Sequence, residues 1–240
     1  MDEQEKQVNI VFDRYKDVGL YLVLPDGAQL VLTRKHIQKV AEEFWKGPDE
    51  MSAEVKNALK SQKCSTCPLG EDELCSAMEP VIPLLKDIDK YVSFDHVTAV
   101  YKGYDESLHV AFTTMQAALR YISALSLIRY CQAGRKYLKY FHGLHALMGG
   151  EEIASRIYLN IYWFHEGKKE EIDKAISEFY EYLLMTSKDQ VERLNRVCKN
   201  DAFINAFVST QMATEFLQMG IDKMLAESVK EFEKAVIENL

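Results

Sequence analysis

Three cysteines fall close together in the segment 63–76, which we call the cysteine loop. Cys64 and Cys67 are separated by two residues, and Cys75 follows a short distance downstream. Thiols with this spacing can point at one centre, because the short connecting loop wraps its backbone around a metal ion. Pro68 stiffens the chain directly after the second thiol. We therefore predict that Cys64, Cys67 and Cys75 bind a metal.

Two other interpretations of the loop remain open. The cysteines can be ordinary thiols in a flexible loop, or Cys64 and Cys67 can form a redox pair. The redox pair is the weaker of the two, since no strand-helix-strand unit surrounds the motif. Zinc and an iron–sulfur cluster both accept thiolate ligands, so the spacing leaves the metal undecided.

A fourth ligand must come from elsewhere in the chain. Cys131 is the best candidate, at the expected end of a long helix next to Gly134, although a helical cysteine is often a small buried hydrophobe. His142 and His145 are the alternatives, because residues three apart share one helix face. Cys198 is read as a core or partly exposed residue without a role.

A basic stretch with interleaved tyrosines follows the same helix. Arg129, Arg135 and Lys136 form a weak candidate anion-binding site, and a solvated helix face is the alternative. The formal net charge of -8 argues against binding nucleic acid through the whole surface. The sequence holds no Walker A loop, Rossmann glycine pattern, nucleophile elbow or HExxH motif, so an enzymatic function is not favoured.

The N-terminal half predicts paired strands and short helices. Segments 20–24 and 28–32 flank Pro25-Asp26-Gly27, which is typical of a hairpin, and Thr33 can cap a helix over 34–45. Two more strands, 95–101 and 108–112, precede Thr113 and Thr114 and another helix. The same order occurs twice, which is consistent with an internal duplication. A further strand is expected over 8–15 and short helices over 52–59 and 80–89.

The C-terminal half is predicted to be helical. One apolar stripe at helical spacing should be buried along a single helix, while Arg120 or Arg129 is exposed. The stripe consists of Met115, Leu119, Ile122, Leu125 and Ile128. Glycines and polar pairs mark breaks between helices. The later helices are expected over 135–148, 151–165, 169–186, 188–199, 202–219 and 221–238.

The overall composition is that of a globular protein, with 48% hydrophobic and 28% charged residues. No apolar run approaches the ~18 residues of a membrane span, and the polar, acidic start differs from a secretory signal. We therefore expect a cytoplasmic protein that binds neither membranes nor nucleic acid. In a reducing compartment, clustered cysteines favour metal or redox chemistry over disulfides.

Several short motifs resemble an uncharacterised bacterial protein family with a helical C-terminal half. The resemblance extends over about 63–179 and rests on Cys67-Pro68-Leu69, Cys75, Val92-Ser93-Phe94-Asp95, Cys131 and Phe141-His142. It departs where that family places proline after the third and fourth cysteines, since Ser76 and Gln132 stand here. The resemblance brings no activity with it, but it adds weight to Cys131 as the fourth thiol ligand.

Together these patterns predict an α+β fold, in which a small antiparallel sheet joins a mostly helical C-terminal half, a helical bundle. The division is 1–113 with the cysteine loop and 114–240, or one continuous domain. The predicted function is a cytosolic, cysteine-ligated metal-binding protein, with a structural zinc clip or an iron–sulfur cluster. Its helices would serve as a regulatory or adaptor surface for a protein partner or a second copy. The alternative is a redox-active iron–sulfur sensor or small oxidoreductase.

Overall fold

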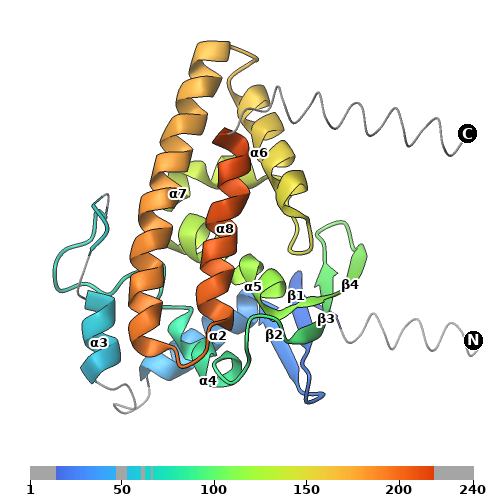
Figure 1. Ribbon diagram of the computed structural model, residues 1–240, viewed down its shortest axis with the longest axis vertical. Helices are drawn as coiled ribbons and strands as arrows, with labels where there is room; N and C mark the ends of the chain where they lie inside the picture. The colour runs from blue at the N-terminus through green and yellow to red at the C-terminus, as the bar shows by residue number, and fades with distance from the viewer. Residues whose placement is uncertain (1–14, 47–52, 61–62, 66, 219–240) are drawn as a thin grey trace, which may run out of the picture.

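The computed structural model describes residues 15–46, 53–60, 63–65 and 67–218. The strand expected over 8–15 lies outside these residues except for its last position, and the helix expected over 221–238 lies wholly outside them. The described part contains a four-stranded sheet and a larger helical region, so the predicted α+β class is confirmed (Figure 1).

The sheet is antiparallel throughout and has the order β2-β1-β3-β4. Both predicted hairpins are confirmed, and β1 joins them by pairing with β3, so that Leu22 lies opposite Ala99. The first strands of the two hairpins therefore pair at the centre of the sheet, and the second strands form its two edges. A helix follows each hairpin. The strands are β1 (Gly19–Val23), β2 (Gln29–Thr33), β3 (His96–Lys102) and β4 (Leu108–Thr114).

The β1–β2 turn explains why this hairpin forms locally. Gly27 has a φ of 79°, a conformation that side chains with a Cβ rarely adopt. The Asp26 carboxylate accepts hydrogen bonds from the Ala28 amide, Lys90 and Tyr91. These hydrogen bonds, the one from Ala28 first, lower the pKa of Asp26 to about 2.

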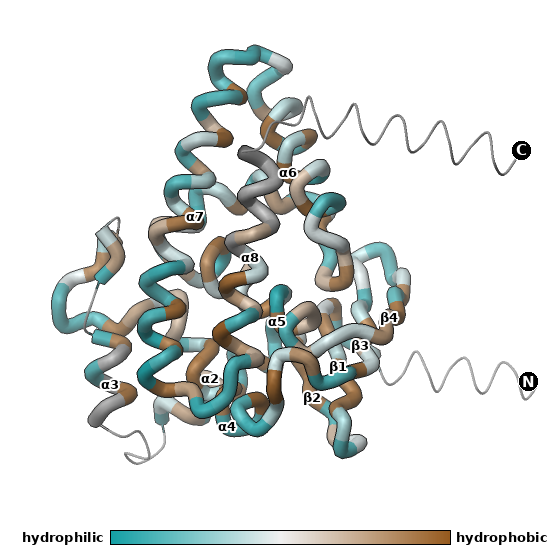
Figure 2. The backbone as a smooth tube through the Cα atoms, viewed as in Figure 1, coloured by the Kyte–Doolittle hydropathy of each residue, from teal (hydrophilic) through white to brown (hydrophobic). Residues whose placement is uncertain are grey.

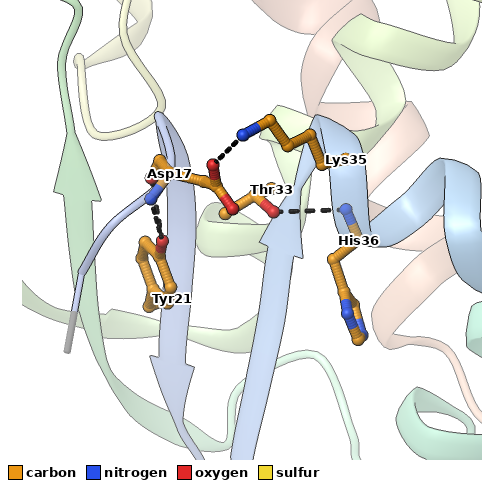
Figure 3. Close-up of polar contacts among 5 residues, drawn as sticks. All are labelled: Asp17, Tyr21, Thr33, Lys35 and His36. Carbon is orange, nitrogen blue, oxygen red and sulfur yellow. Dashed lines mark hydrogen bonds and ion pairs between the residues drawn. The ribbon is translucent and has the colours of Figure 1, made fainter. Parts of the chain in front are cut away.

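Thr33 ends β2 and begins helix α2 (Arg34–Lys46), as the sequence predicts. Its Oγ1 accepts a hydrogen bond from the His36 amide at 3.3 Å, which satisfies one of the free N–H groups of the first turn (Figure 3). Lys35 pairs with Asp17 at 2.5 Å, and Asp17 also exchanges hydrogen bonds with Tyr21 of β1. The helix start is thus fixed to the adjacent hairpin.

Short elements connect the two hairpins. They are α3 (Ala53–Lys60), the 3-10 helix η1 (Ile82–Leu84) and α4 (Leu85–Ile88), and the cysteine loop lies between α3 and η1. Asp89 accepts hydrogen bonds from the Lys199 and Asn200 amides, and Asp201 accepts two from Ser93. These bonds tie the connection to the turn between the last two described helices.

The helical half starts after Thr114, and the apolar stripe predicted there is mostly buried. Met115, Leu119, Ile122 and Ile128 are buried, whereas Leu125 is half-buried. Arg120 and Arg129 are also half-buried, so the expected exposure of one of them is wrong. The elements are α5 (Met115–Ala124), the π-helix η2 (Leu125–Tyr130), the 3-10 helix η3 (Gly134–Phe141), α6 (Gly150–Phe164), α7 (Lys169–Val197) and α8 (Ala202–Gln218).

Two helix predictions in this half are wrong. The helix expected over 135–148 is a 3-10 helix that ends at Phe141, and Gly143 then adopts a φ of 74°. The break expected between Thr186 and Lys188 is absent, because α7 is continuous over 29 residues and buries Ser187. No glycine or proline interrupts α7 there, and packing against α8 holds both halves of the helix.

One hydrophobic cluster extends from the sheet through α5 to α7 and α8. Figure 2 shows hydrophobic residues on the strands and α5, and alternating hydrophilic and hydrophobic residues along α7. The core therefore supports both the sheet and the inner face of α7. None of the described helices is long and apolar enough to cross a membrane.

Candidate metal centre

The inner face of α7 carries a row of polar side chains. Tyr182, Thr186, Gln190 and Arg193 follow one another at intervals of four, four and three residues, so they lie on one side of the helix. Their exposed fractions are only 4, 1, 1 and 2%. Buried polar groups of this kind need partners, because leaving them without hydrogen bonds is costly. For Gln190 and Arg193 the partners are cysteine sulfurs, whereas the Tyr182 hydroxyl donates to the Leu127 carbonyl.

Arg193 brings two sulfurs of the cysteine loop together. Its Nη1 lies 3.7 Å from the sulfur of Cys64 and 3.9 Å from that of Cys75, and its Nη2 lies 3.9 Å from Cys64. The Nε2 of Gln190 lies 3.5 Å from the sulfur of Cys75. Both cysteines are buried, so these N–H groups face sulfur rather than water. The first and third thiols of the predicted motif therefore share one polar site.

Short-range backbone bonds set the shape of the cysteine loop. The Cys67 amide donates to the Cys64 carbonyl at 2.8 Å, which closes a tight turn between the first two cysteines. The Cys75 amide donates to the Leu59 carbonyl at the end of α3, and the Cys75 carbonyl accepts from Met78 and Glu79. Cys67 itself is half-buried, and its side chain is nearer the surface than the other two.

Cys131 approaches the site from the end of η2. The π-helix closes with a bond from the Cys131 amide to the Ser126 carbonyl at 2.9 Å, and the chain then becomes extended. Gly134 permits the turn that follows, since a Cβ there would lie 2.0 Å from the Leu127 carbonyl oxygen and 2.5 Å from the Tyr182 hydroxyl. The Cys131 thiol lies near the Tyr182 hydroxyl and contributes to the raised pKa of Tyr182. Tyr182 belongs to the same row as Arg193.

The loop and the Cys131 segment meet at a surface cleft of about 510 Å³. Pro68, which follows Cys67, and Gln132, which follows Cys131, both line this cleft together with Tyr182. All four cysteines proposed as ligands thus lie around the inner face of α7 or next to a residue that lines the adjoining cleft.

The ionisation of the buried groups follows from their surroundings. Burial raises the pKa of the Cys64 thiol to about 12, against the lowering effect of Arg193, and the Asp189 carboxylate adds to the rise. Burial also raises the pKa of Tyr182, and the nearby thiols Cys131 and Cys64 contribute in the same direction. Without a metal ion at the site, Cys64 is therefore protonated at neutral pH, even beside Arg193.

Two observations bear on whether a metal fits. In the described part of the chain, Thr186 Oγ1, Gln190 Oε1 and Arg193 Nε are buried without a hydrogen-bond partner, so part of the row's hydrogen-bonding capacity is unused. In the same residues, no group of three or more His, Cys, Asp or Glu side chains is already arranged around a common metal position. Metal binding would therefore require Cys67 and Cys131 to draw in toward Cys64 and Cys75.

The comparison with family models gives one match. Residues 36–233 match the family described as Domain of unknown function (DUF6901). The chain belongs to this family. Neither a curated protein nor a solved structure matches it. The resemblance to an uncharacterised family is confirmed to this extent. The match does not test whether the family shares the cysteine motif.

The matched part of this DUF6901 chain also contains the remaining candidates, which lie away from the cysteines. The side chain of His142 is exposed, and the His145 ring stacks on His109 at 4.4 Å near β4. The anion-binding candidates separate: Arg135 and Lys136 are exposed, with Lys136 at the cleft near Pro68, whereas Arg129 lines a different cavity.

Sequence reasoning missed Arg193, Gln190 and Tyr182. The available signal was weak: these polar residues alternate with Phe179, Leu183 and Leu194, so they fall within the apolar side of a long helical pattern. Only the burial of α7 distinguishes them from an ordinary charged helix face.

Proposed function

We propose that this protein binds a metal through Cys64, Cys67, Cys75 and Cys131, and that the site is a structural zinc clip. The observation that carries the proposal is Arg193, a buried guanidinium whose only polar partners in the described residues are two sulfurs and which forms no ion pair there. A buried cation beside neutral thiols would be poorly compensated. The Asp189 carboxylate also lies near Cys64 but forms no ion pair with Arg193. Thiolates bound to a metal would place negative charge in direct contact with the guanidinium.

Metal binding of this kind would couple to folding. Cys64 is protonated in the metal-free chain, so binding would release its proton, and the affinity would rise with pH. The site would tie the cysteine loop to α7 and to the end of η2, which are far apart in the sequence. Arg193 and Gln190 would then act as outer partners that orient the sulfurs and balance their charge.

A redox-active iron–sulfur cluster is the second candidate, and the cleft next to the site favours it. The cleft of about 510 Å³ is lined by Pro68 and Gln132, which directly follow Cys67 and Cys131, so a small reactant in it would lie next to the chain segments that carry these cysteines. Hydrogen bonds and charges next to the sulfurs are features that set cluster potentials. The same four cysteines would hold the cluster.

We place the protein's interactions on its helical half, as a regulatory or adaptor module of the cytoplasm. The end of α6 exposes Tyr162, Trp163 and Phe164, with exposed fractions of 43, 62 and 54%. Exposed aromatic residues are enriched in protein interfaces. All five cysteines are free, which is consistent with a reducing compartment.

Anaerobic purification followed by metal analysis and absorption spectroscopy tests the proposal. A colourless protein with one zinc per chain supports the clip, and a brown protein absorbing near ~400 nm supports the cluster. Cys64→Ser should lose the metal, whereas Cys198→Ser should keep it, because Cys198 lies outside the site. A wild-type protein that is stable and metal-free, or equal metal in both variants, would contradict the proposal.

A further inference from the structure

A second cavity, of about 220 Å³, lies between α5, η2 and the segment that leads from η3 into α6. Its walls are mostly apolar and include Leu125, Ile128, Leu144 and Ile157. Three arginines also line it: Arg34 from α2, Arg120 from α5 and Arg129 from η2. Neither aspartate nor glutamate contributes to the lining. The cavity is therefore both hydrophobic and positively charged.

The three arginines have no acidic partner in the described part of the chain. Arg120 donates only to the backbone carbonyls of Ala117 and Met148, at 3.3 and 3.4 Å. The chain has 37 acidic and 29 basic residues, so a shortage of carboxylates does not explain this. The nearby carboxylates Glu152 and Asp105 act on His145 and do not line the cavity.

Aromatic side chains complete one wall. Tyr101 and Tyr121 meet edge to face with ring centroids 6.0 Å apart, and the His145 ring stacks on Tyr101 at 5.6 Å. Close by, the Tyr130 hydroxyl is buried without a hydrogen-bond partner among the described residues. Arg129 and Arg34 are near enough to lower its pKa, although burial raises it overall. An unpaired hydroxyl thus lies beside two unpaired cations.

We propose that this cavity binds a small monocarboxylate whose apolar body is about the size of one aromatic ring. A guanidinium group binds a carboxylate through two parallel N–H bonds, and the planar ring suits the aromatic and aliphatic walls. An engineered cavity of ~150 Å³ holds benzene, so the larger volume here leaves room for a carboxylate. Inorganic phosphate would match the charges but would leave the apolar walls unfilled.

Calorimetric titration of the full-length protein tests this site with phenylacetate as the probe. We expect phenylacetate to bind at least tenfold more tightly than phenylacetamide, which has the same shape without the charge. Arg120→Met should weaken phenylacetate binding tenfold or more while retaining the packing of the side-chain stem. Arg196→Met is the matched control, since Arg196 is exposed on α7 outside the cavity, and it should bind like wild type.

A second variant keeps the test sharp if Arg120→Met does not fold. Ala124 lines the cavity, so Ala124→Leu should fill part of it and abolish binding with all three arginines present. The proposal is overturned if millimolar phenylacetate does not bind, if the amide binds equally well, or if both variants bind like wild type. Tighter binding of phosphate than of phenylacetate would also overturn it. None of these results depends on metal at the cysteines.

Discussion

Replacing Arg193 by methionine separates a metal centre from a set of buried neutral thiols. Methionine retains most of the apolar volume of the side chain but removes the guanidinium and its contacts of 3.7–3.9 Å with the sulfurs of Cys64 and Cys75. If these sulfurs are metal-bound thiolates, the loss of such an outer partner should weaken metal binding ~10–100-fold. This range corresponds to about 1.4–2.8 kcal/mol.

The opposite result is expected if the thiols are neutral and carry no metal. Arg193 is then a buried cation that contacts no negative charge, and its replacement by an apolar residue should stabilise the protein rather than destabilise it. The assay is a chelator competition for bound metal, together with melting temperatures measured before and after chelation. Arg196→Met is the control, because Arg196 is exposed near the end of the same helix. An Arg193→Met protein that melts higher than wild type and holds metal equally well would refute the reasoning.

Three further predictions concern the fourth ligand, the core and the first turn. Cys131→Ala should reduce bound metal as strongly as Cys64→Ser does, and full metal occupancy in Cys131→Ala would exclude Cys131 as a ligand. Leu119→Ala should lower the free energy of unfolding, measured with urea, by about 2–5 kcal/mol, because Leu119 is fully buried. Leu125→Ala should lower it less, because Leu125 is half-buried on the cavity wall. Equal losses would contradict this placement of the core. The pKa of Asp26 falls from 3.8 to about 2 on folding, so its contribution to stability is present above about pH 4 and is lost as the pH falls through about 2. As the pH falls from about 4 to about 2, the free energy of unfolding of Asp26→Asn should therefore decrease less than that of wild type. Parallel curves of unfolding free energy against pH would show that the Asp26 carboxylate contributes nothing.

The fold could be predicted to the extent that its signals are local. Pro25-Asp26-Gly27 specifies a hairpin, and Thr33 marks a helix start through a bond that spans three residues. The continuity of α7 was not visible, since it depends on packing against α8. The π-helix and 3-10 helix around Cys131 were also missed, because Gly134 permits a close contact with Leu127 and Tyr182 that only the folded chain creates.

The sequence predicts the cysteines of the candidate site but not the polar side chains of α7 that contact them. Cys64, Cys67 and Cys75 stand out because their separation in the sequence is short, and the structure brings the sulfurs of Cys64 and Cys75 to one guanidinium. Arg193 and Gln190 are more than one hundred residues away from Cys75 and carry no motif. Their role depends on which face of α7 is buried, and a helical pattern with polar residues on both faces does not decide that.

The distance along the chain between Cys75 and Arg193 has a consequence for biosynthesis. These residues are 118 positions apart, so the ribosome completes the cysteine loop long before α7 exists to cover it. At 5–20 residues per second, the interval is roughly 6–24 s. Until α7 is synthesised, the thiols of the nascent loop lack the helix that contacts Cys64 and Cys75 in the folded chain. The order of synthesis therefore gives the cysteines a period without this helix, which ends when α7 packs over Cys64 and Cys75.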